Sequence, residues 1–343
     1  MVGVKYNKIL MRKFLLLLIS FLIGIGLFIW VGKMVGWQEI KMAFSVFTGW
    51  KGLVIFGLTF LIMLFGIWEW KVILKGEGIN ISFWELFRPY LAGYSIMYLA
   101  SIVLVGREAF RSYVLKRKNS VPWPKSIAST IIDRILDFTI ELVFIFFGII
   151  FFLLLVGFPP KNLAMIFGGV FLISVIGTSF SYFKISKRES IAKFFIGIFI
   201  PKYRNDHTPL HVEHEIFNFF KIKNRYMWKG FGLTFLEKLV KLLRTWLLIL
   251  FLGKKISLLP VVSILGFSYL AMMIPIPANL GSHEAVQALV FNSLGLGANI
   301  GAVFTMISRG AELIFVLLGA LFFFRLGARL LGDSFLKKNN NPN

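Results

Sequence analysis

Three charged residues lie near the end of the chain, in sequence that is otherwise apolar enough for the interior of a membrane. The stretch 281–312 reads GSHEAVQALVFNSLGLGANIGAVFTMISRGAE and contains Glu284, Arg309 and Glu312. An ionisable side chain at the centre of a bilayer costs about 2.5–3.5 kcal/mol on insertion scales, so such residues usually have a task. An arginine in such a place is suited to a phosphate group, which its planar guanidinium can hold through two hydrogen bonds.

An earlier stretch, 106–137, repeats this arrangement and reads GREAFRSYVLKRKNSVPWPKSIASTIIDRILD. The glutamate precedes the arginine by 26 residues in the first copy and by 25 in the second. Internal repeats are a common construction of transporters, whose binding site lies at the repeat interface. Chance similarity between two apolar helices is the alternative. The corresponding residues, first copy and then second, are Glu108 and Glu284, Arg134 and Arg309, and Asp137 and Glu312.

Three acids share one face of the helix that we predict over 126–156. Asp133, Asp137 and Glu141 recur every four residues, and Arg134 precedes Asp137 by three. A cation surrounded by acids suits an anionic ligand group that competes with the acids for it. The alternative is a salt bridge between helices that only fixes their packing, although apolar side chains can fill that role.

A second charged face is predicted on the helix over 228–252. Glu237, Lys241 and Arg244 lie on one side of it, and Lys238 lies on the same helix. We expect Glu237 to pair with Lys241, which leaves Arg244 with positive charge for a ligand. Snorkelling of these side chains towards the inner end of the span is the alternative.

The remaining polar candidates are weaker. Glu108 and Glu284 each begin a short helix after a glycine, where an acid favours the positive helix end, so local capping competes with a coupling role. His207, His211 and His214 lie beside acids, but they fit a solvated loop better than a metal site. We therefore expect neither a metal nor a cofactor.

Composition places the chain in the class of polytopic membrane proteins, because no soluble core could bury 57% hydrophobic residues in a chain of 343. The net charge of +22 is explained by cytoplasmic loops and anionic lipid headgroups, so no nucleic-acid partner is expected. The chain contains no cysteine, which excludes disulfides, thiol nucleophiles and thiolate metal sites.

Charges and helix breakers predict an all-α bundle that forms one integral membrane domain over 1–330. Its repeat halves cover about 14–183 and 228–330, a cytoplasmic amphipathic linker covers 184–227, and a polar tail, which we expect to be disordered, covers 331–343. Positive charge in the loops places both termini in the cytoplasm, with the protein in the plasma membrane. The predicted spans are about 14–32, 52–70, 126–156, 163–183, 228–252, 256–274 and 299–324.

Two further elements are predicted to be re-entrant hairpins. Residues 89–105 are long enough to span, but the loop that follows carries six basic residues that prefer the cytoplasm, so we expect the chain to turn near Gly106 and return through 107–116. A plain span is the alternative. The segment 281–296 is expected to return to the outer side, which makes the halves an inverted repeat suited to alternating access. The six basic residues are Arg107, Arg111, Lys116, Arg117, Lys118 and Lys125.

Aromatic residues accompany these elements. Trp68, Glu69, Trp70 and Lys71 form an aromatic and charged edge that is typical of a membrane interface. Tyrosines recur at every fourth position within the first hairpin, where they either line a path for a headgroup or pack against a neighbour. They are Tyr90, Tyr94 and Tyr98.

The strings GREAFRSYVLKRK with IIDRILDF, and GSHEAVQALV with SRGAELIFVLLG, resemble the signature regions of the lysylphosphatidylglycerol synthase transmembrane-region family, also called flippase-like or UPF0104 proteins. The resemblance covers about 10–330. It implies a polytopic bundle with re-entrant elements that moves lipids with charged or sugar headgroups between leaflets. By motif, the family's polar positions fall on Arg134, Asp137, Glu284, Arg309 and Glu312.

One motif departs from the family. A Pro-Gly-Gly type turn commonly precedes the second glutamate, whereas this chain has PIPANLGSHE. The chain ends soon after its last predicted span, so we do not expect the aminoacyl-transferase domain that some members carry.

The function expected from these observations is that of a lipid flippase or transporter rather than an enzyme. The predicted substrates are anionic phospholipids or polyprenyl-phosphate lipids, including glycosylated or aminoacylated ones, and no ATP-binding loop is visible. The alternatives are a membrane-embedded transferase and an accessory subunit that presents lipid to a soluble glycosyltransferase partner.

Overall fold

The structure is a computed structural model that describes residues 48–99, 106–158, 161–187, 208–273 and 282–339. These residues are helical and contain no β-strand. The helices are α3 (Trp50–Gly76), α4 (Phe83–Leu99), α5 (Gly106–Asn119), α6 (Trp123–Val156), α7 (Lys161–Lys187), α9 (Thr208–Phe219), α10 (Arg225–Phe251), α11 (Leu258–Met272), α12 (Ser282–Ser293) and α13 (Ala298–Asn339).

Local sequence explains where the long helices begin and end. α6 follows Pro122, has a second proline in its first turn, and ends at Gly157, whose φ of 91° suits a residue without a side chain. Asn224 caps α10 by accepting a hydrogen bond from the backbone N–H of Tyr226 at 3.0 Å. The charged side chains of α6 and α10 therefore occupy fixed levels along the bundle.

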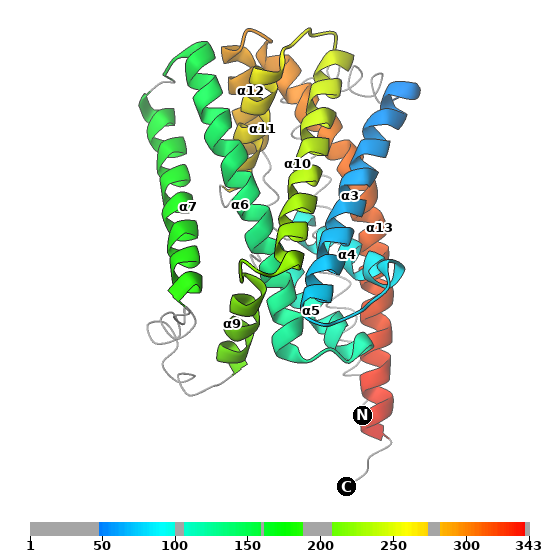
Figure 1. Ribbon diagram of the computed structural model, residues 1–343. Coiled ribbons are helices and arrows are strands. Elements are labelled where there is room, and N and C mark those ends of the chain that lie inside the picture. The colour runs from blue at the N-terminus through cyan, green and yellow to red at the C-terminus, as the bar shows by residue number, and fades with distance from the viewer. Residues whose placement is uncertain (1–47, 100–105, 159–160, 188–207, 274–281, 340–343) are drawn as a thin grey trace.

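Figure 1 shows the helices side by side in one bundle, with α12 near the upper end of the view and α9 near the lower end. We use upper and lower in this sense. α3 packs along α10, α6 along α11, and α4 against α13. The largest apolar core joins α6, α11, α12 and α13, with Phe144, Phe267, Phe291 and Phe304 among its buried members.

Three pairs of helices, α6 with α11, α4 with α13 and α12 with α13, approach so closely that only glycine fits at the contact. A Cβ atom on Gly148 of α6 would lie 3.0 Å from Cα of Gly266 on α11, and one on Gly266 would lie 2.8 Å from the carbonyl oxygen of Phe144. Gly319 of α13 packs in the same way on the backbone of Leu91 in α4. Small residues at helix contacts are typical of bundles in lipid, where close backbone approach supplies the packing energy.

Three helices are long and apolar enough to cross a membrane among the described residues: α3, α6 and the Ala298–Phe323 part of α13. Their outward faces carry exposed large apolar side chains, such as Phe146 and Phe147 on α6 and Leu317 and Leu321 on α13. Water would oppose such surfaces, whereas lipid tails accept them. α10 is as long as α3, but Glu237, Lys238, Lys241 and Arg244 make it much more polar.

These elements agree with the predicted helices at 52–70, 126–156, 163–183, 228–252 and 256–274, with ends that differ by a few residues, whereas the helix predicted at 299–324 continues as α13 to Asn339. The predicted first span at 14–32 lies outside the described residues, and so do the turns of both predicted hairpins, at 100–105 and 274–281. The described part of the linker contains α9, which packs against α6. The predicted tail begins within α13, which runs to Asn339.

The predicted interface edge at the end of α3 is only half correct. Trp68 is exposed, but Glu69 and Trp70 are 1% and 0% exposed. They point inwards because α3 packs against α10, α6 and α4 over this stretch. The prediction of a basic cytoplasmic loop after residue 105 is also wrong for two of its residues, because Arg107 and Arg111 lie buried on α5.

Candidate functional site

A cavity of about 440 Å³ lies inside the bundle and combines apolar, aromatic and charged walls. Its tyrosines include Tyr90, Tyr94 and Tyr98 of α4, so the predicted tyrosine row faces this space. Pockets of this size with a few convergent polar groups are typical of ligand sites. The charged residues of the wall are Arg107, Arg134, Asp137, Glu141, Glu237, Lys241, Arg244, Arg309 and Glu312.

A group of ion pairs joins α5 to α6 at the wall of the cavity, which Arg107 lines. Arg111 is fully buried, donates to Asp133 at 2.7 Å and stacks on the ring of Trp70 at 3.8 Å. Arg107 lies 3.4 Å from Asp133 and 3.2 Å from Glu108. If α5 moved away from α6, the buried arginines and Asp133 would be left as uncompensated charges. These contacts therefore hold α5 on α6.

Lys238 of α10 is the centre of a second group. It is 0% exposed, and its Nζ lies 2.7 Å from Asp137, 3.3 Å from Glu141 and 3.7 Å from Glu237. Lys241 binds Glu237 at 2.8 Å from the cavity side. The acids of α6 and α10 thus share two lysines.

Two ion pairs involve α13 higher in the bundle. Arg244 of α10 donates to Glu312 at 2.9 Å and to the hydroxyl of Thr59 at 3.1 Å, so it links three helices. Arg309 lies 3.1 Å from Glu284 of α12. These pairs connect α13 to α10 and to α12, and both of their arginines line the cavity.

Arg134 differs from the other basic residues of the wall. Its side chain is exposed, and it makes no ion pair with any other described residue. The wall carries five basic residues and four acidic ones, and the other four basic residues are each ion-paired. The guanidinium of Arg134 is therefore accessible to a visiting anion.

One group of carboxylates has the spacing of a cation site. The oxygens of Glu69, Asp137 and Glu237 lie within 4.8 Å of one another, and no other such group occurs in the described part of the chain. The ammonium of Lys238 lies between two of them, however, and its positive charge disfavours a metal ion there.

Comparison with known proteins agrees with the sequence motifs. A model of the lysylphosphatidylglycerol synthase TM region matches residues 17–320. The chain belongs to this family. The resemblance predicted from the two signature strings is confirmed.

Similar proteins occur in archaea, where they are called UPF0104 membrane proteins. One from Methanocaldococcus jannaschii is 27% identical over 252 residues, covering 70% of this chain and 74% of the relative. One from Pyrococcus horikoshii is 25% identical over 316 residues, covering 87% and 92%. One from Methanothermobacter thermautotrophicus is 24% identical and covers 74% and 78%. No solved structure matches the chain.

The structure of this family member brings all ten predicted site residues to one region. Seven line the cavity: Arg134, Asp137, Glu237, Lys241, Arg244, Arg309 and Glu312. The other three lie one contact behind the wall, since Asp133 and Glu108 bind the lining residue Arg107, and Glu284 binds Arg309.

Two predicted relationships need correction. Glu237 does pair with Lys241, but Arg244 has no surplus charge, because Glu312 reaches it from α13. Arg134 does not pair with its neighbour Asp137, which binds Lys238 and lies 3.8 Å from Arg107. Partners on other helices were not visible in the spacing within one helix.

The sequence reasoning missed four buried residues of the site: Glu69, Arg107, Arg111 and Lys238. The two arginines were assigned to a cytoplasmic loop, and Glu69 to an interface. A signal was present for Lys238, which lies in an apolar span one residue after Glu237. No signal within α3 separates Glu69 from an ordinary interface acid.

Proposed function

We propose that the protein moves lipids with an anionic or phosphate headgroup from one leaflet of the membrane to the other. The headgroup binds in the charged cavity and the acyl or prenyl chains stay in lipid. The observation that carries this proposal is Arg134, an exposed and unpaired guanidinium on the wall of a cavity inside a membrane bundle. A phosphate oxygen pair matches its planar donors.

The cavity also suits the part of a lipid next to its phosphate. Besides charged groups, its wall contains Tyr94, Tyr98, Met272 and Met273, which offer apolar surface and two hydroxyls. Methionine side chains adapt their shape to different partners. Glycosylated or aminoacylated headgroups would find both acids and bases on the wall, whereas a purely apolar molecule would leave them unpaired.

The arrangement of the short helices supports movement by alternating access. α4 and α5 flank one segment predicted to be a hairpin turn, 100–105, and α11 and α12 flank the other, 274–281, and both segments lie outside the described residues. In Figure 1, α12 lies near the upper end and α5 in the lower part of the bundle. Elements of this kind that enter from opposite sides act as the two gates of an inverted repeat.

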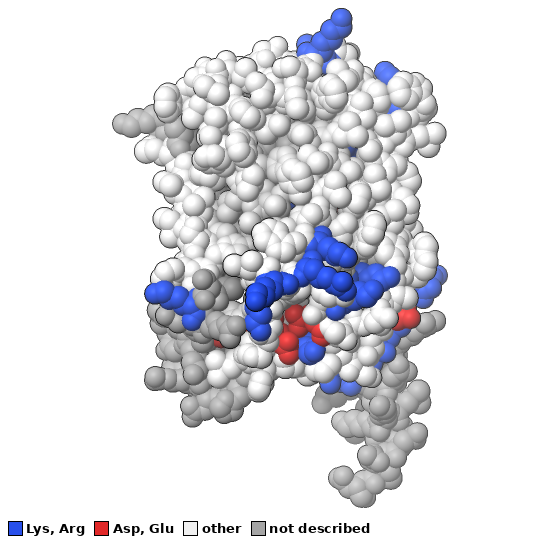
Figure 2. Space-filling view, viewed as in Figure 1, with Lys and Arg blue, Asp and Glu red and all other residues white. Residues whose placement is uncertain are grey.

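The distribution of charge supports an orientation in the plasma membrane. Figure 2 shows a broad belt that is almost free of charge, with basic residues gathered below it. Exposed basic residues of the lower end include Lys75, Lys221, Lys223, Arg225 and Lys229. An excess of lysine and arginine marks the cytoplasmic side, so the lower end faces the cytoplasm.

Transbilayer movement of labelled lipids in vesicles that contain the purified protein tests this function. Phospholipids and polyprenyl-phosphate lipids are compared for wild type, Arg134→Ala, Arg309→Ala and Arg88→Ala. We expect Arg134→Ala to slow movement about ten-fold or more, since hydrogen bonds to a charged group contribute about 1.5–3 kcal/mol. Arg309→Ala also slows it, because Glu284 is released into the wall.

Arg88→Ala is the matched control, because Arg88 is exposed on α4 and does not line the cavity. It should move lipid at the wild-type rate. If Arg134→Ala does the same, the cavity is not the headgroup site. If wild type moves no lipid but a purified fraction forms a modified lipid, the membrane transferase or accessory-subunit alternative replaces transport.

A further inference from the structure

Glu69 is a buried acid that the headgroup cavity does not explain. It lies on α3, is 1% exposed, and does not line the cavity. Its Oε1 atom has no hydrogen-bond partner. A buried carboxylate without a partner has a high free-energy cost. The unpaired Oε1 atom of Glu69 therefore indicates that a positive charge or a proton binds there.

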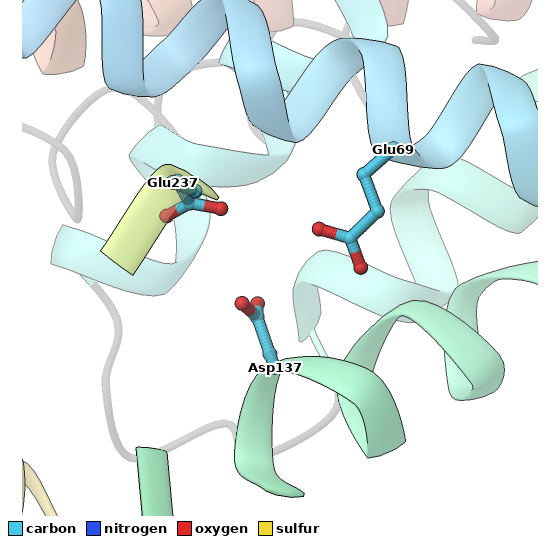
Figure 3. A group of neighbouring side chains, drawn as sticks. All are labelled: Glu69, Asp137 and Glu237. Atoms are coloured by element: carbon cyan, nitrogen blue, oxygen red, sulfur yellow. The ribbon is translucent and has the colours of Figure 1, made fainter. Parts of the chain in front are cut away.

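Figure 3 shows the carboxylates of Glu69, Asp137 and Glu237 directed towards a common space from α3, α6 and α10. Their oxygens lie within 4.8 Å of one another. Three negative charges at this distance repel strongly away from water. The group is stable only if at least one charge is neutralised locally.

Lys238 neutralises only part of the group. Its Nζ binds Asp137 at 2.7 Å and lies 3.7 Å from Glu237, and Lys241 binds Glu237 at 2.8 Å. Glu69 forms no ion pair with a described residue, so the uncompensated charge is on this side chain. An added metal ion would meet the ammonium of Lys238, whereas a proton would not.

We propose that Glu69 is a proton-binding site of this protein. In the protonated state its O–H donates a hydrogen bond to the carboxylate of Asp137 or Glu237. The proton comes from water in the cavity, because these two acids line the cavity and Glu69 lies behind them. The reaction converts a carboxylate and a proton into a carboxylic acid, and no other bond changes.

The groups that face Glu69 come from each helix packed on α3. Asp137 of α6 and Glu237 of α10 place carboxylate oxygens within 4.8 Å of that of Glu69, while Asp133 lies one turn earlier on α6 and Lys238 of α10 lies 2.7 Å from Asp137. On the α4 and α5 side, Tyr90 packs against Gly66 and Arg111 stacks on Trp70. On α13, Glu312 binds Arg244, which also donates to Thr59 of α3. Thr59 lies about 15 Å from Glu69 along α3, so this pair is distant from Glu69.

If the proposed transport is correct, this site supplies its coupling. An anionic headgroup at Arg134 also attracts Lys241, which lies on the same wall and shields Glu237. Weaker shielding of the acids favours protonation of Glu69. An anionic headgroup and a proton are then bound together, and a proton gradient drives lipid movement.

Infrared spectroscopy of the purified protein in lipid nanodiscs tests the site without any lipid substrate. The difference between carbon-13 glutamate-labelled and unlabelled protein isolates the carbonyl bands of protonated glutamic acids from those of aspartic acid and lipid esters. Two such bands are expected at neutral pH. The second belongs to Glu77, outside the spans, because burial and a hydrogen bond with Glu215 raise the pKa of Glu77 to about 8.

Glu69→Gln should lower the integrated intensity of the protonated-glutamate bands by about half, and Glu77→Gln should remove the other half. Glu69→Asp should also remove the Glu69 half, because the carbonyl of an aspartic acid does not carry the glutamate label. Glu85→Gln, at an exposed acid of α4, is the matched control and should change nothing. A wild-type band in Glu69→Gln overturns the proposal. So does a band that appears in wild type only after chelation and exchange into salt-free buffer, because the site would then hold a metal ion.

A second measurement separates the site from the transport function. In vesicles with a pH gradient, wild type and Glu85→Gln should move lipid at a rate that depends on the gradient. Glu69→Gln should still move lipid but lose this dependence. If wild type moves no lipid, the proposed function fails, while the infrared result still decides whether Glu69 binds a proton; if Glu69→Gln keeps the dependence, the coupling role is overturned.

Discussion

The ammonium of Lys238 shows how single residues hold this bundle together. Three carboxylates from α6 and α10 surround it, and its side chain is only 1% exposed. Burial removes the hydration of an ammonium and of each acid, and only their mutual attraction restores part of that loss. Removing the lysine alone therefore takes from Glu141 its ion-pair partner and from Asp137 its nearest cation.

We expect Lys238→Met to lower the free energy of unfolding by about 3–5 kcal/mol, which is typical when one partner of a buried ion pair is lost. The measurement is thermal unfolding in detergent, followed by circular dichroism. Lys241→Met is the matched control, since its side chain is 23% exposed and binds one acid, and its loss should be smaller. Equal losses for the two variants would contradict the central role of Lys238.

Sequence alone found most of the charged residues but few of their partners. The spacing of four between Glu237 and Lys241 predicts a contact within one helix, and that contact is present. Lys238 and Asp137 are separated by 101 residues, so only the packing of α10 on α6 brings them together. The same reason explains why Glu312 was not foreseen as the partner of Arg244.

At the scale of elements, the contact of α6 with α11 is limited by two glycines. Cβ of any residue at position 148 would meet Cα of Gly266 at 3.0 Å and the carbonyl oxygen of Val262 at 3.1 Å. Both are backbone atoms, which cannot move aside as a side chain does. The helices would have to separate along their shared apolar core.

Gly148→Ala is therefore expected to destabilise the protein by about 1–3 kcal/mol, the usual cost of overpacking. Intrinsic helix propensity alone would predict a gain of about 1 kcal/mol. Gly169→Ala on α7, where nothing lies within 4 Å of the added Cβ, is the matched control and should keep that gain. Thermal unfolding measures both, and a stabilised Gly148→Ala would show that α6 and α11 are not in close contact.

Helix positions were easier to predict than helix faces. Proline and glycine mark the ends of α6, so its predicted range of 126–156 nearly matches Trp123–Val156. At the end of α3, however, Trp68 is 52% exposed and Trp70 is 0% exposed. Two tryptophans around an acid indicate an interface when both are exposed, but here only Trp68 is exposed and Glu69 and Trp70 are buried in the bundle.

At the scale of the whole molecule, the inverted arrangement can be tested because the chain has no native cysteine. We expect Ser120→Cys to react with an impermeant thiol reagent only from the cytoplasmic side, and Ser282→Cys only from the outer side. Ser120 follows α5 in the lower part of the bundle, whereas Ser282 begins α12 next to His283, which lines the cavity (Figure 1). Labelling is measured on intact cells and on inverted vesicles.

Exposed lysines at the two ends give reference positions for this experiment. Lys221→Cys before α10 should label from the cytoplasmic side, and Lys255→Cys between α10 and α11 should label from the outer side. If Ser120→Cys and Ser282→Cys both react from the same side of the membrane, judged by the two lysine reference variants, then α4–α5 and α11–α12 enter the membrane from one side. The alternating-access part of the proposed function would then be withdrawn.

The polarity of α10 has a consequence for how the protein is made. The four charged residues in the middle of α10 carry an insertion cost of about 10 kcal/mol or more if that helix leaves the translocon alone. Asp137 and Glu141 on α6 are synthesised earlier and can receive Lys238, but Glu312, the partner of Arg244, is synthesised after α10. α10 must therefore be retained beside the translocon, or held by earlier helices, until α13 emerges. A chain interrupted before Glu312 would leave Arg244 of α10 without its carboxylate partner.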